Sequence, residues 1–382
     1  MEKKNAVLRR LAELLRENGQ RIMEVNAGDV AECSRDDEAL FDRLKIDEKK
    51  VEGMIGSVEM VLGLEDPEDK VLSRVDNEGL RVENRTIAFG TVLIVYESRP
   101  DVTIEASVIA FKAGNRVLLK GGKEAKRTNL VLVELWQQAL EAEGLEREWV
   151  RYVEAGREEV QQLVRGEGEK VDLIVPRGGE GLIKFVEENA KVPVIVSGRG
   201  NNFLYIGAEC DFEMAVKVVL NGKSRISVCN ALDKVLVDQA VERDKVEGLV
   251  GALVGDGIEV LNGDEMAEGQ KEEMLRQEFL ASKIMVMTVS GVEEAIRLIN
   301  QYSGGHTASV VTTNTDVAER FQREVDCAAV MHNASTRLTD GSIFGYGAEI
   351  ATSTQKLHSR GPIGVGQMVT NKWFVFGDGH TR

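Results

Sequence analysis

Residues 91–122 read TVLIVYESRPDVTIEASVIAFKAGNRVLLKGG, and this stretch gives the strongest indication of the fold. Two apolar runs, Val92–Tyr96 and Arg116–Lys120, have the length and character of buried strands. Between them, Val102–Ala113 follows a helical pattern. A strand, a helix and a second strand in this order predict two parallel strands in a sheet that is covered by helices.

The same alternation continues on both sides of a glycine-rich break, Gly198-Arg199-Gly200. Before the break, strands are predicted at Trp149–Glu154, Asp172–Pro176 and Val192–Ser197, and helices at Thr128–Glu143, Glu158–Arg165 and Gly181–Ala190. After it, strands are predicted at Lys234–Asp238, Ser282–Val289, Ala308–Thr312 and Cys327–His332, and helices at Asp211–Leu220 and Val292–Tyr302. We therefore predict an α/β protein with two domains, each built on a parallel-type sheet.

Both ends of the chain carry other patterns. Leu8, Leu11 and Leu15 recur near helical period, which predicts an N-terminal helical region. Residues 71–87 alternate around Asn77-Glu78-Gly79 and predict a β-hairpin, a type of element that often pairs with a second subunit. The final alternating segment, Lys372–Gly377, predicts a strand that joins another sheet.

Composition excludes several classes of protein. The net charge of −16 over 382 residues gives no basic surface for nucleic acid. The N-terminus lacks the apolar core of a secretory signal, and no stretch approaches the ~18 apolar residues of a membrane span. The four cysteines and four histidines are too scattered for a disulfide framework or a metal site. We expect reduced thiols, a cytoplasmic location, no metal and no membrane partner.

Two turns after predicted strands have the composition of anion sites. In the first, Lys120 and Gly121 end a strand, and Lys123 and Lys126 follow in a basic helix start. Backbone amides at such a turn suit a cofactor phosphate, although a solvated basic helix start has the same composition. In the second, Arg177-Gly178-Gly179 combines a bidentate donor with close backbone approach. The alternative is an ordinary tight turn, and the chain contains no GxGxxG fingerprint.

Cys229 is the candidate nucleophile. It lies in Asn221–Asn230, between a predicted helix and a predicted strand, and Lys223 and Arg225 would favour its thiolate. A buried cysteine that only fills space is the alternative for any single cysteine.

Six segments in this order resemble the aldehyde dehydrogenase superfamily and, within it, the gamma-glutamyl phosphate reductase family. They are Ile94–Thr103, Val175–Gly179, Val228–Leu232, Asn333–Gly341, Phe344–Ile350 and Ser353–Pro362. The resemblance implies an NADP-binding domain at residues 1–198 that includes the hairpin, a catalytic domain at 199–362, and an oligomerisation strand at 363–382. It also implies a homo-oligomer.

The implied reaction is the NADPH-dependent reduction of L-glutamate 5-phosphate to L-glutamate 5-semialdehyde, the second step of proline biosynthesis, with glutamate 5-kinase as pathway partner. Cys229 would form a thioester and expel phosphate, and Asn230 or the backbone amide of Cys229 would stabilise the oxyanion. The cofactor-binding residues are then Lys120, Gly121, Lys123, Arg177, Gly178, Gly179 and Glu278. The substrate-binding residues are Arg99, Asn333, Ser335, Thr336 and Arg337.

The sequence also departs from its relatives. Hydrolytic members of the superfamily carry a water-activating glutamate where this chain has Val196–Gly200, which contains no acid, and this difference favours phosphate exchange. Asn202-Phe203 stands where a Cys-His pair is common, and Ile226 where proline is common, in a stretch one residue short. Two alternatives are a coenzyme A-acylating aldehyde dehydrogenase and a non-catalytic protein on the same fold.

Overall fold

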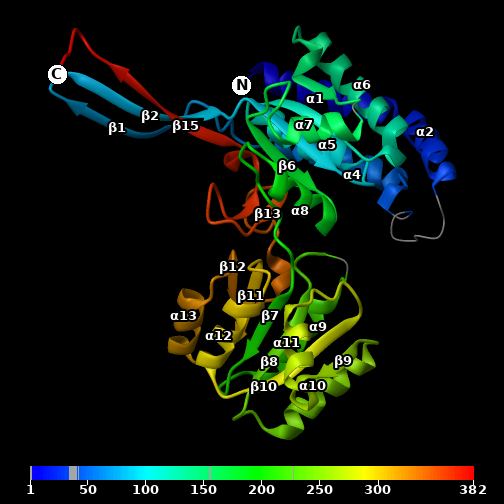
Figure 1. Cartoon of the computed structure of the whole chain (residues 1–382), viewed down its shortest axis with the longest axis vertical. Helices are drawn as coiled ribbons and strands as arrows, with labels where there is room; N and C mark the ends of the chain where they lie inside the picture. Colours follow the sequence, from blue (N-terminus) through cyan, green and yellow to red (C-terminus); the bar gives the residue numbers. More distant parts are fainter. Residues whose placement is uncertain (1, 34–40, 42, 155, 227) are drawn as a thin grey trace. The chain divides into compact units, whose positions relative to one another are not determined.

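The computed structural model describes residues 2–33, 41, 43–154, 156–226 and 228–382, which form two compact units (Figure 1). The first unit comprises Met1–Val196, Gly345–Ala351 and Ile363–Arg382, and the second comprises Ser197–Phe344 and Thr352–Pro362. Residues 345–351, which we predicted within the second domain, therefore belong to the first unit. The reason is that Ile350 and Ile363 are buried in its core, where the amide of Ile350 donates to the carbonyl of Ile363 at 2.8 Å.

A four-stranded parallel sheet forms the centre of the first unit, in the order β5-β4-β3-β6. Its strands are β3 Thr91–Tyr96, β4 Arg116–Lys120, β5 Val150–Tyr152 and β6 Leu173–Arg177. One face is covered by α1 Glu2–Glu17, α2 Gly19–Glu32, α4 Glu48–Leu62, α5 Val102–Lys112 and α6 Lys126–Ala142, and the other by α7 Arg157–Val164 and α8 Glu180–Asn189 (Figure 1). Alternate side chains of β3 pack on opposite faces of the sheet. Val92 and Ile94 belong to one apolar cluster, and Leu93 and Val95 belong to the other.

The predicted strand Val192–Ser197 is wrong. The segment forms two isolated bridges instead of a strand, one between Val194 and Ile174 of β6 and one between Ser197 and Ser353. The carbonyl of Pro193 accepts from the amide of Ile174 (2.9 Å), and the amide of Ile195 donates to the carbonyl of Ile174 (3.0 Å). Pro193 has no N–H to donate to the preceding residues of that strand, so the ladder does not continue on that side.

An antiparallel sheet of three strands completes the first unit, and we call it the arm. It consists of β1 Val71–Asn77, β2 Leu80–Ala88 and β15 Val369–Phe376, with β2 in the middle (Figure 1). The predicted hairpin is confirmed: Glu78 (φ 49°) and Gly79 (φ 87°) form its two-residue turn. The predicted C-terminal strand joins this hairpin of its own chain, from Val369 beside Ala88 to Phe376 beside Arg81.

The second unit is built on a six-stranded sheet in the order β12-β11-β7-β8-β10-β9, and all of its pairs are parallel. Its strands are β7 Asn202–Ile206, β8 Leu232–Asp238, β9 Glu259–Asn262, β10 Lys283–Val289, β11 Thr307–Val311 and β12 Ala329–His332. The helices α9 Phe212–Lys223 and α10 Arg243–Gly255 cover one face, and α11 Glu268–Arg276, α12 Val292–Tyr302 and α13 Thr315–Glu324 cover the other. The short strands β13 Ala351–Ser353 and β14 Gly361–Ile363 pair with each other. Among the described residues, no helix combines the length and apolar character that a membrane crossing requires.

Candidate active site

Cys229 lies in the second unit, in the loop between the end of α9 and the start of β8. It is therefore at the amino end of β8, and the neighbouring strand β7 begins there too, directly after Gly200 and Asn201. The carboxyl ends of parallel strands are the usual place for ligands. In this unit the candidate nucleophile lies at the opposite end of the strands. Ser227, in the same loop, lies outside the described residues.

The side chain of Asn202 connects three segments around this loop. Its Nδ2 donates to the carbonyls of Cys229 (2.8 Å) and Ala231 (2.7 Å), and its Oδ1 accepts from the amide of Thr307 (3.0 Å). Asn202 is fully buried, so these bonds are shielded from water. The sequence analysis missed this role. In the sequence, only the pair Asn201-Asn202 after the glycine-rich break pointed to this role of Asn202.

Gly200 allows the backbone of its loop to lie against that of the nucleophile. A Cβ atom at this position would approach the carbonyl oxygen of Cys229 to 2.6 Å, closer than any side chain tolerates. The amide of Gly200 donates to Oε1 of Glu278 at 2.9 Å. Burial raises the pKa of the Glu278 carboxyl. Glu278, predicted as a cofactor-binding residue, is thus held beside the loop that contacts Cys229.

Asn230 connects the nucleophile loop to the Asn-Ala-Ser-Thr-Arg segment. Its Nδ2 donates to the carbonyls of Arg337 (3.3 Å) and Thr339 (3.0 Å), and its Oδ1 accepts from the guanidinium of Arg337. The hydroxyl of Thr336 donates to the carbonyl of Asn230 at 2.8 Å. Both Nδ2 hydrogens are therefore used within the protein, and the side chain holds two loops together.

Arg337 is the cation beside the candidate nucleophile. Burial lowers the pKa of its guanidinium, and the positive charge of Arg225 lowers it further, whereas the charge of Cys229 acts in the opposite direction. The guanidinium is therefore within electrostatic reach of the sulfur. Lys223, expected to favour the thiolate, instead forms a 2.7 Å ion pair with Asp233, and both side chains are buried. Its charge is balanced inside the core.

Three residues predicted to bind substrate make internal hydrogen bonds. Asn333 has a positive φ (53°), and its side chain exchanges two 3.0 Å bonds with the backbone of Thr312. Ser335 accepts from the amide of Arg337 at 3.2 Å, and Thr336 bonds to the Asn230 loop as described above. These groups shape the segment that presents Arg337.

In the first unit, Lys120 lies at the carboxyl end of β4 and is half-buried. Burial lowers the pKa of its ammonium, and the charge of Lys126 lowers it further. Its Nζ lies 5.8 Å from the ring centroid of Tyr152, whose hydroxyl donates to the carbonyl of Gly121 at 3.2 Å. Lys123 is exposed. Since no described carboxylate forms an ion pair with Lys120, its charge fits an anionic ligand.

The Arg177-Gly178-Gly179 turn holds a carboxylate of the protein itself. Oε2 of Glu97 accepts from the amide of Gly179 at 2.8 Å, and a Cβ on Gly178 would approach that oxygen to 2.6 Å. The close approach that we predicted for a ligand is thus made here by Glu97. Arg99, on the loop after β3, donates to Asp101 at 2.9 Å and is about half exposed, at 47%.

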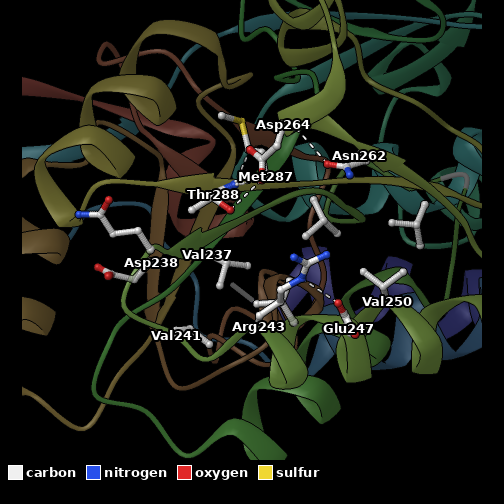
Figure 2. Close-up of a pocket in the computed structure, with 14 residues that line it drawn as sticks. Val237, Asp238, Val241, Arg243, Glu247, Val250, Asn262, Asp264, Met287 and Thr288 are labelled. Atoms are coloured by element: carbon white, nitrogen blue, oxygen red, sulfur yellow. Dashed lines mark hydrogen bonds and ion pairs between the residues drawn. The ribbon is translucent and has the colours of Figure 1, made fainter.

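A cavity of about 620 Å³ in the second unit lies at the carboxyl ends of β8, β9 and β10, against α10. β8 has seven residues, which separates this cavity from the Cys229 end by roughly 20 Å. Figure 2 shows its polar groups paired internally, Arg243 with Glu247 and Asp264 with Thr288. None of the predicted site residues lines it.

Two other cysteines, Cys210 and Cys327, have thiols that burial keeps protonated more strongly than usual. Burial raises the pKa of Cys327 to about 11 and also raises that of Cys210. Within the described ranges, no group of three or more His, Cys, Asp or Glu side chains could hold a metal ion.

Comparison with known proteins identifies the family. The model of the aldehyde dehydrogenase family matches residues 1–261 and 267–354. The gamma-glutamyl phosphate reductase of Nitratiruptor sp. is 42% identical, over 100% of this chain and 95% of that protein. The chain belongs to the aldehyde dehydrogenase family, among its gamma-glutamyl phosphate reductases.

Other relatives agree with this result. The gamma-glutamyl phosphate reductase of Wolinella succinogenes is 40% identical, over 100% of this chain and 95% of that protein. The crystal structure of the Thermotoga maritima gamma-glutamyl phosphate reductase superposes with a TM-score of 0.94 at 37% identity, covering 100% of this chain and 94% of that one. The predicted fold class and family are confirmed. The chain is accordingly an oxidoreductase that uses a nicotinamide cofactor and a small-molecule substrate.

Proposed function

We propose that this enzyme reduces L-glutamate 5-phosphate to L-glutamate 5-semialdehyde with NADPH and releases phosphate. The proposal rests on the hydrogen bonds that connect the Cys229-Asn230 loop to the Thr336-Arg337 segment. These parts are more than a hundred residues apart in sequence. Both segments belong to the stretches that resemble the gamma-glutamyl phosphate reductase family, and four relatives that are 38–42% identical to the whole chain carry that name.

Cys229 attacks the acyl carbon of the substrate as a thiolate, and the phosphate leaves to give a thioester. The positive charges of Arg337 and Arg225 favour the thiolate. Because the Asn230 amide is already bonded to two carbonyls, the backbone amide of Cys229 is the better oxyanion donor of the two candidates. When bound, the nicotinamide cofactor would supply the hydride that reduces the thioester, which releases the aldehyde and returns Cys229 to its thiolate form.

The Val196–Gly200 segment supports phosphate release over hydrolysis. It contains no carboxylate, and the amide of Gly198 is used in a 3.0 Å bond to the carbonyl of Thr352. Without a base there to activate water, the thioester survives long enough to be reduced or to exchange with phosphate.

Lys120→Ala should raise the KM for NADPH roughly 10- to 100-fold, because Lys120 is proposed to contact the adenosine ribose or its 2′-phosphate. The estimate follows from the 1.5–3 kcal/mol typical of a hydrogen bond to a charged group. Glu278 and the Arg177–Gly179 turn are proposed as further cofactor contacts. Initial-rate kinetics with NADPH and NADH test the assignment. Lys70→Ala removes an exposed lysine of the same unit and should change neither KM, whereas an unchanged KM in Lys120→Ala would exclude the proposed contact.

Arg337→Lys should lower kcat/KM for the acyl phosphate about 10- to 100-fold and leave the KM for NADPH nearly unchanged. Lysine keeps the charge but loses the planar fork that reaches both Asn230 and an anionic substrate. Arg360→Lys is the matched control, because Arg360 pairs with Asp326 in the same unit at 2.7 Å. Equal losses of kcat/KM in Arg337→Lys and Arg360→Lys would show that Arg337 does not bind the substrate. Arg99 is proposed as a second substrate cation.

The exposed apolar side chains of the arm support a homo-oligomer. Val71, Leu72 and Val75 on β1 are 52–60% exposed, and Trp373 and Val375 on β15 are 56–57% exposed. Apolar surface of this kind marks protein–protein contacts. Glutamate 5-kinase as a pathway partner and a cytoplasmic location stay predictions from the sequence.

One assay separates the proposed reaction from its alternatives. The purified protein is given L-glutamate 5-semialdehyde and NADP⁺ with inorganic phosphate, with coenzyme A, or with neither. Reduction of NADP⁺ that depends on phosphate supports the proposal. Dependence on coenzyme A would favour an acylating dehydrogenase, and activity without either would indicate a hydrolytic one.

A further inference from the structure

Lys234 is a buried lysine that no step of the proposed reaction uses. It lies in β8 and is 0% exposed. Its Nζ donates to Oδ1 of Asn201 at 2.5 Å and to the carbonyl of Gln277, and it lies 3.9 Å from the ring centroid of Phe279. An ammonium group has three hydrogens to donate, and the amide oxygen, the carbonyl and the ring face match them.

The surroundings of Lys234 are unfavourable for a charge. Burial lowers the pKa of Lys234 to about 7. The negative charges of Asp233 and Glu278 act in the opposite direction, and the positive charge of Lys223 adds to the effect of burial. A methionine would fill much of the same space without this cost, so what distinguishes lysine at this position is the set of groups that its ammonium holds.

The two hydrogen-bond partners of Lys234 adjoin residues of the candidate active site. Asn201 directly follows Gly200, and Gln277 directly precedes Glu278. The amide of Gly200 in turn donates to Oε1 of Glu278 at 2.9 Å. A closed ring of covalent and hydrogen bonds therefore joins five residues of the second unit: Lys234, Asn201, Gly200, Glu278 and Gln277.

The conformation of Asn201 depends on this ring. Its φ is positive (49°), which is unfavourable for a residue with a side chain, although asparagine tolerates it better than most. The residue is buried, and its Nδ2 donates to two backbone carbonyls at 2.7 and 2.9 Å. Without Lys234, its Oδ1 would be buried without that donor, which favours a rearrangement of the turn. Gly200 would then shift against the carbonyl of Cys229, which a Cβ on this glycine would approach to 2.6 Å.

We propose that Lys234 is a positioning residue that holds Gly200 and Glu278 beside the Cys229 loop, and that turnover depends on it more than substrate binding does. This inference rests on the proposed function. The proposed oxyanion donor, the backbone amide of Cys229, is one peptide away from the carbonyl that Gly200 contacts. A small shift of this backbone would misplace the donor and leave the thiol in place.

The test is the oxidation of L-glutamate 5-semialdehyde with NADP⁺ and inorganic phosphate. Lys234→Met should lower kcat about 10- to 100-fold, as expected when reacting groups are displaced by about 1 Å. The KM for the aldehyde should stay within about threefold, because no substrate contact is removed. Alkylation of Cys229 by iodoacetamide needs no oxyanion donor, so its rate, followed by mass spectrometry of the Cys229 peptide, should also be nearly unchanged.

Lys112→Met is the matched control. Lys112 is likewise 0% exposed, and its Nζ donates to an asparagine side chain, Asn5 at 2.7 Å, and to a backbone carbonyl, that of Leu62 at 3.5 Å. It belongs to α5 of the first unit. The control should lose thermal stability, as Lys234→Met does, and keep its kcat.

A second variant tests whether Lys234 acts through Asn201. Asn201→Gly permits the positive φ and removes the side-chain oxygen that Lys234 holds. It should lower kcat with little change in KM, and the double variant should lose about as much as Lys234→Met alone, because coupled residues are not additive. If Lys234→Met fails to fold, as judged by thermal unfolding, the kcat and KM of Asn201→Gly decide instead.

Three results would overturn the inference alone: a normal kcat in Lys234→Met, an equal loss of kcat in Lys112→Met, or additive losses in the double variant. A parent protein that requires coenzyme A or water in place of phosphate would overturn the proposed function. The variants are then compared with that acceptor, since all three reactions pass through Cys229. A parent protein that is inactive with every acceptor would overturn both.

Discussion

Cys229→Ser should abolish reduction of the acyl phosphate, with a loss on the order of 10⁴-fold or more in kcat, as expected when a covalent nucleophile is removed. The serine hydroxyl is not ionised near neutral pH, so the cations near position 229 have no thiolate to stabilise. Cys229 is partly exposed and the change in volume is small, so the fold should persist. Mass spectrometry after mixing with substrate, without cofactor, should find an acyl adduct on the parent protein and none on the variant.

Two other cysteines serve as controls for this experiment. Cys210→Ser and Cys327→Ser should keep their activity, since both thiols have raised pKa values and lie outside the nucleophile loop. Cys327 is buried, so its variant is expected to lose some stability without losing turnover. Near-normal reduction by Cys229→Ser would show that the reaction does not pass through a thioester on this residue.

Lys223→Met should destabilise the protein by about 3–5 kcal/mol, the usual cost of leaving one member of a buried ion pair without its partner. Lys223 ends α9 and Asp233 lies at the start of β8, so their 2.7 Å bond holds the two ends of the loop that carries Cys229. Asp233 also accepts from the amide of Phe279 at 3.3 Å, in the segment that follows Glu278. Denaturant unfolding measures the free-energy change, and the midpoint should fall without a change in slope.

A double variant separates the cost of an unpaired charge from the loss of favourable contacts. Lys223→Met combined with Asp233→Leu removes both charges, and replacement of a buried pair by apolar groups is often neutral, so most of the stability should return. Arg243→Ala breaks an exposed pair with Glu247 and should cost less than about 1 kcal/mol. A loss in Lys223→Met as small as in Arg243→Ala would mean that this pair does not hold the loop.

The alternation of strands and helices was visible in the sequence, because apolar runs of strand length are buried on both sides in a parallel sheet. Some elements could not be found in this way. β7, which reads NFLYI and is buried throughout, begins shortly after the glycine-rich break and was not predicted. α10 contains Gly248 and Gly251, which weaken a helical pattern. Its apolar contacts to the sheet override that local preference.

For the candidate site, the sequence indicated the chemical groups but not their arrangement. Cys229 could be singled out from its motif, since a nucleophile needs a particular residue type. The role of Asn202 could not, because its partners follow from the order of strands β8, β7 and β11 in the sheet. Asn333 and Ser335 were assigned to the substrate from the family resemblance, and only hydrogen-bond geometry reveals their bonds to the backbone.

The last strand of the chain also determines when the first unit can be finished during synthesis. β15 closes one edge of β2, and Asn115 donates to the carbonyl of Met368, a partner 253 positions away in sequence. At a ribosomal speed of about 5–20 residues per second, Asn115 waits roughly 10–50 s for that partner. The strands of the second unit, from residue 202 to residue 332, all leave the ribosome before β15 does. A nascent chain that stops before residue 369 leaves β2 with one unpaired edge, which makes it a target for aggregation and chaperones.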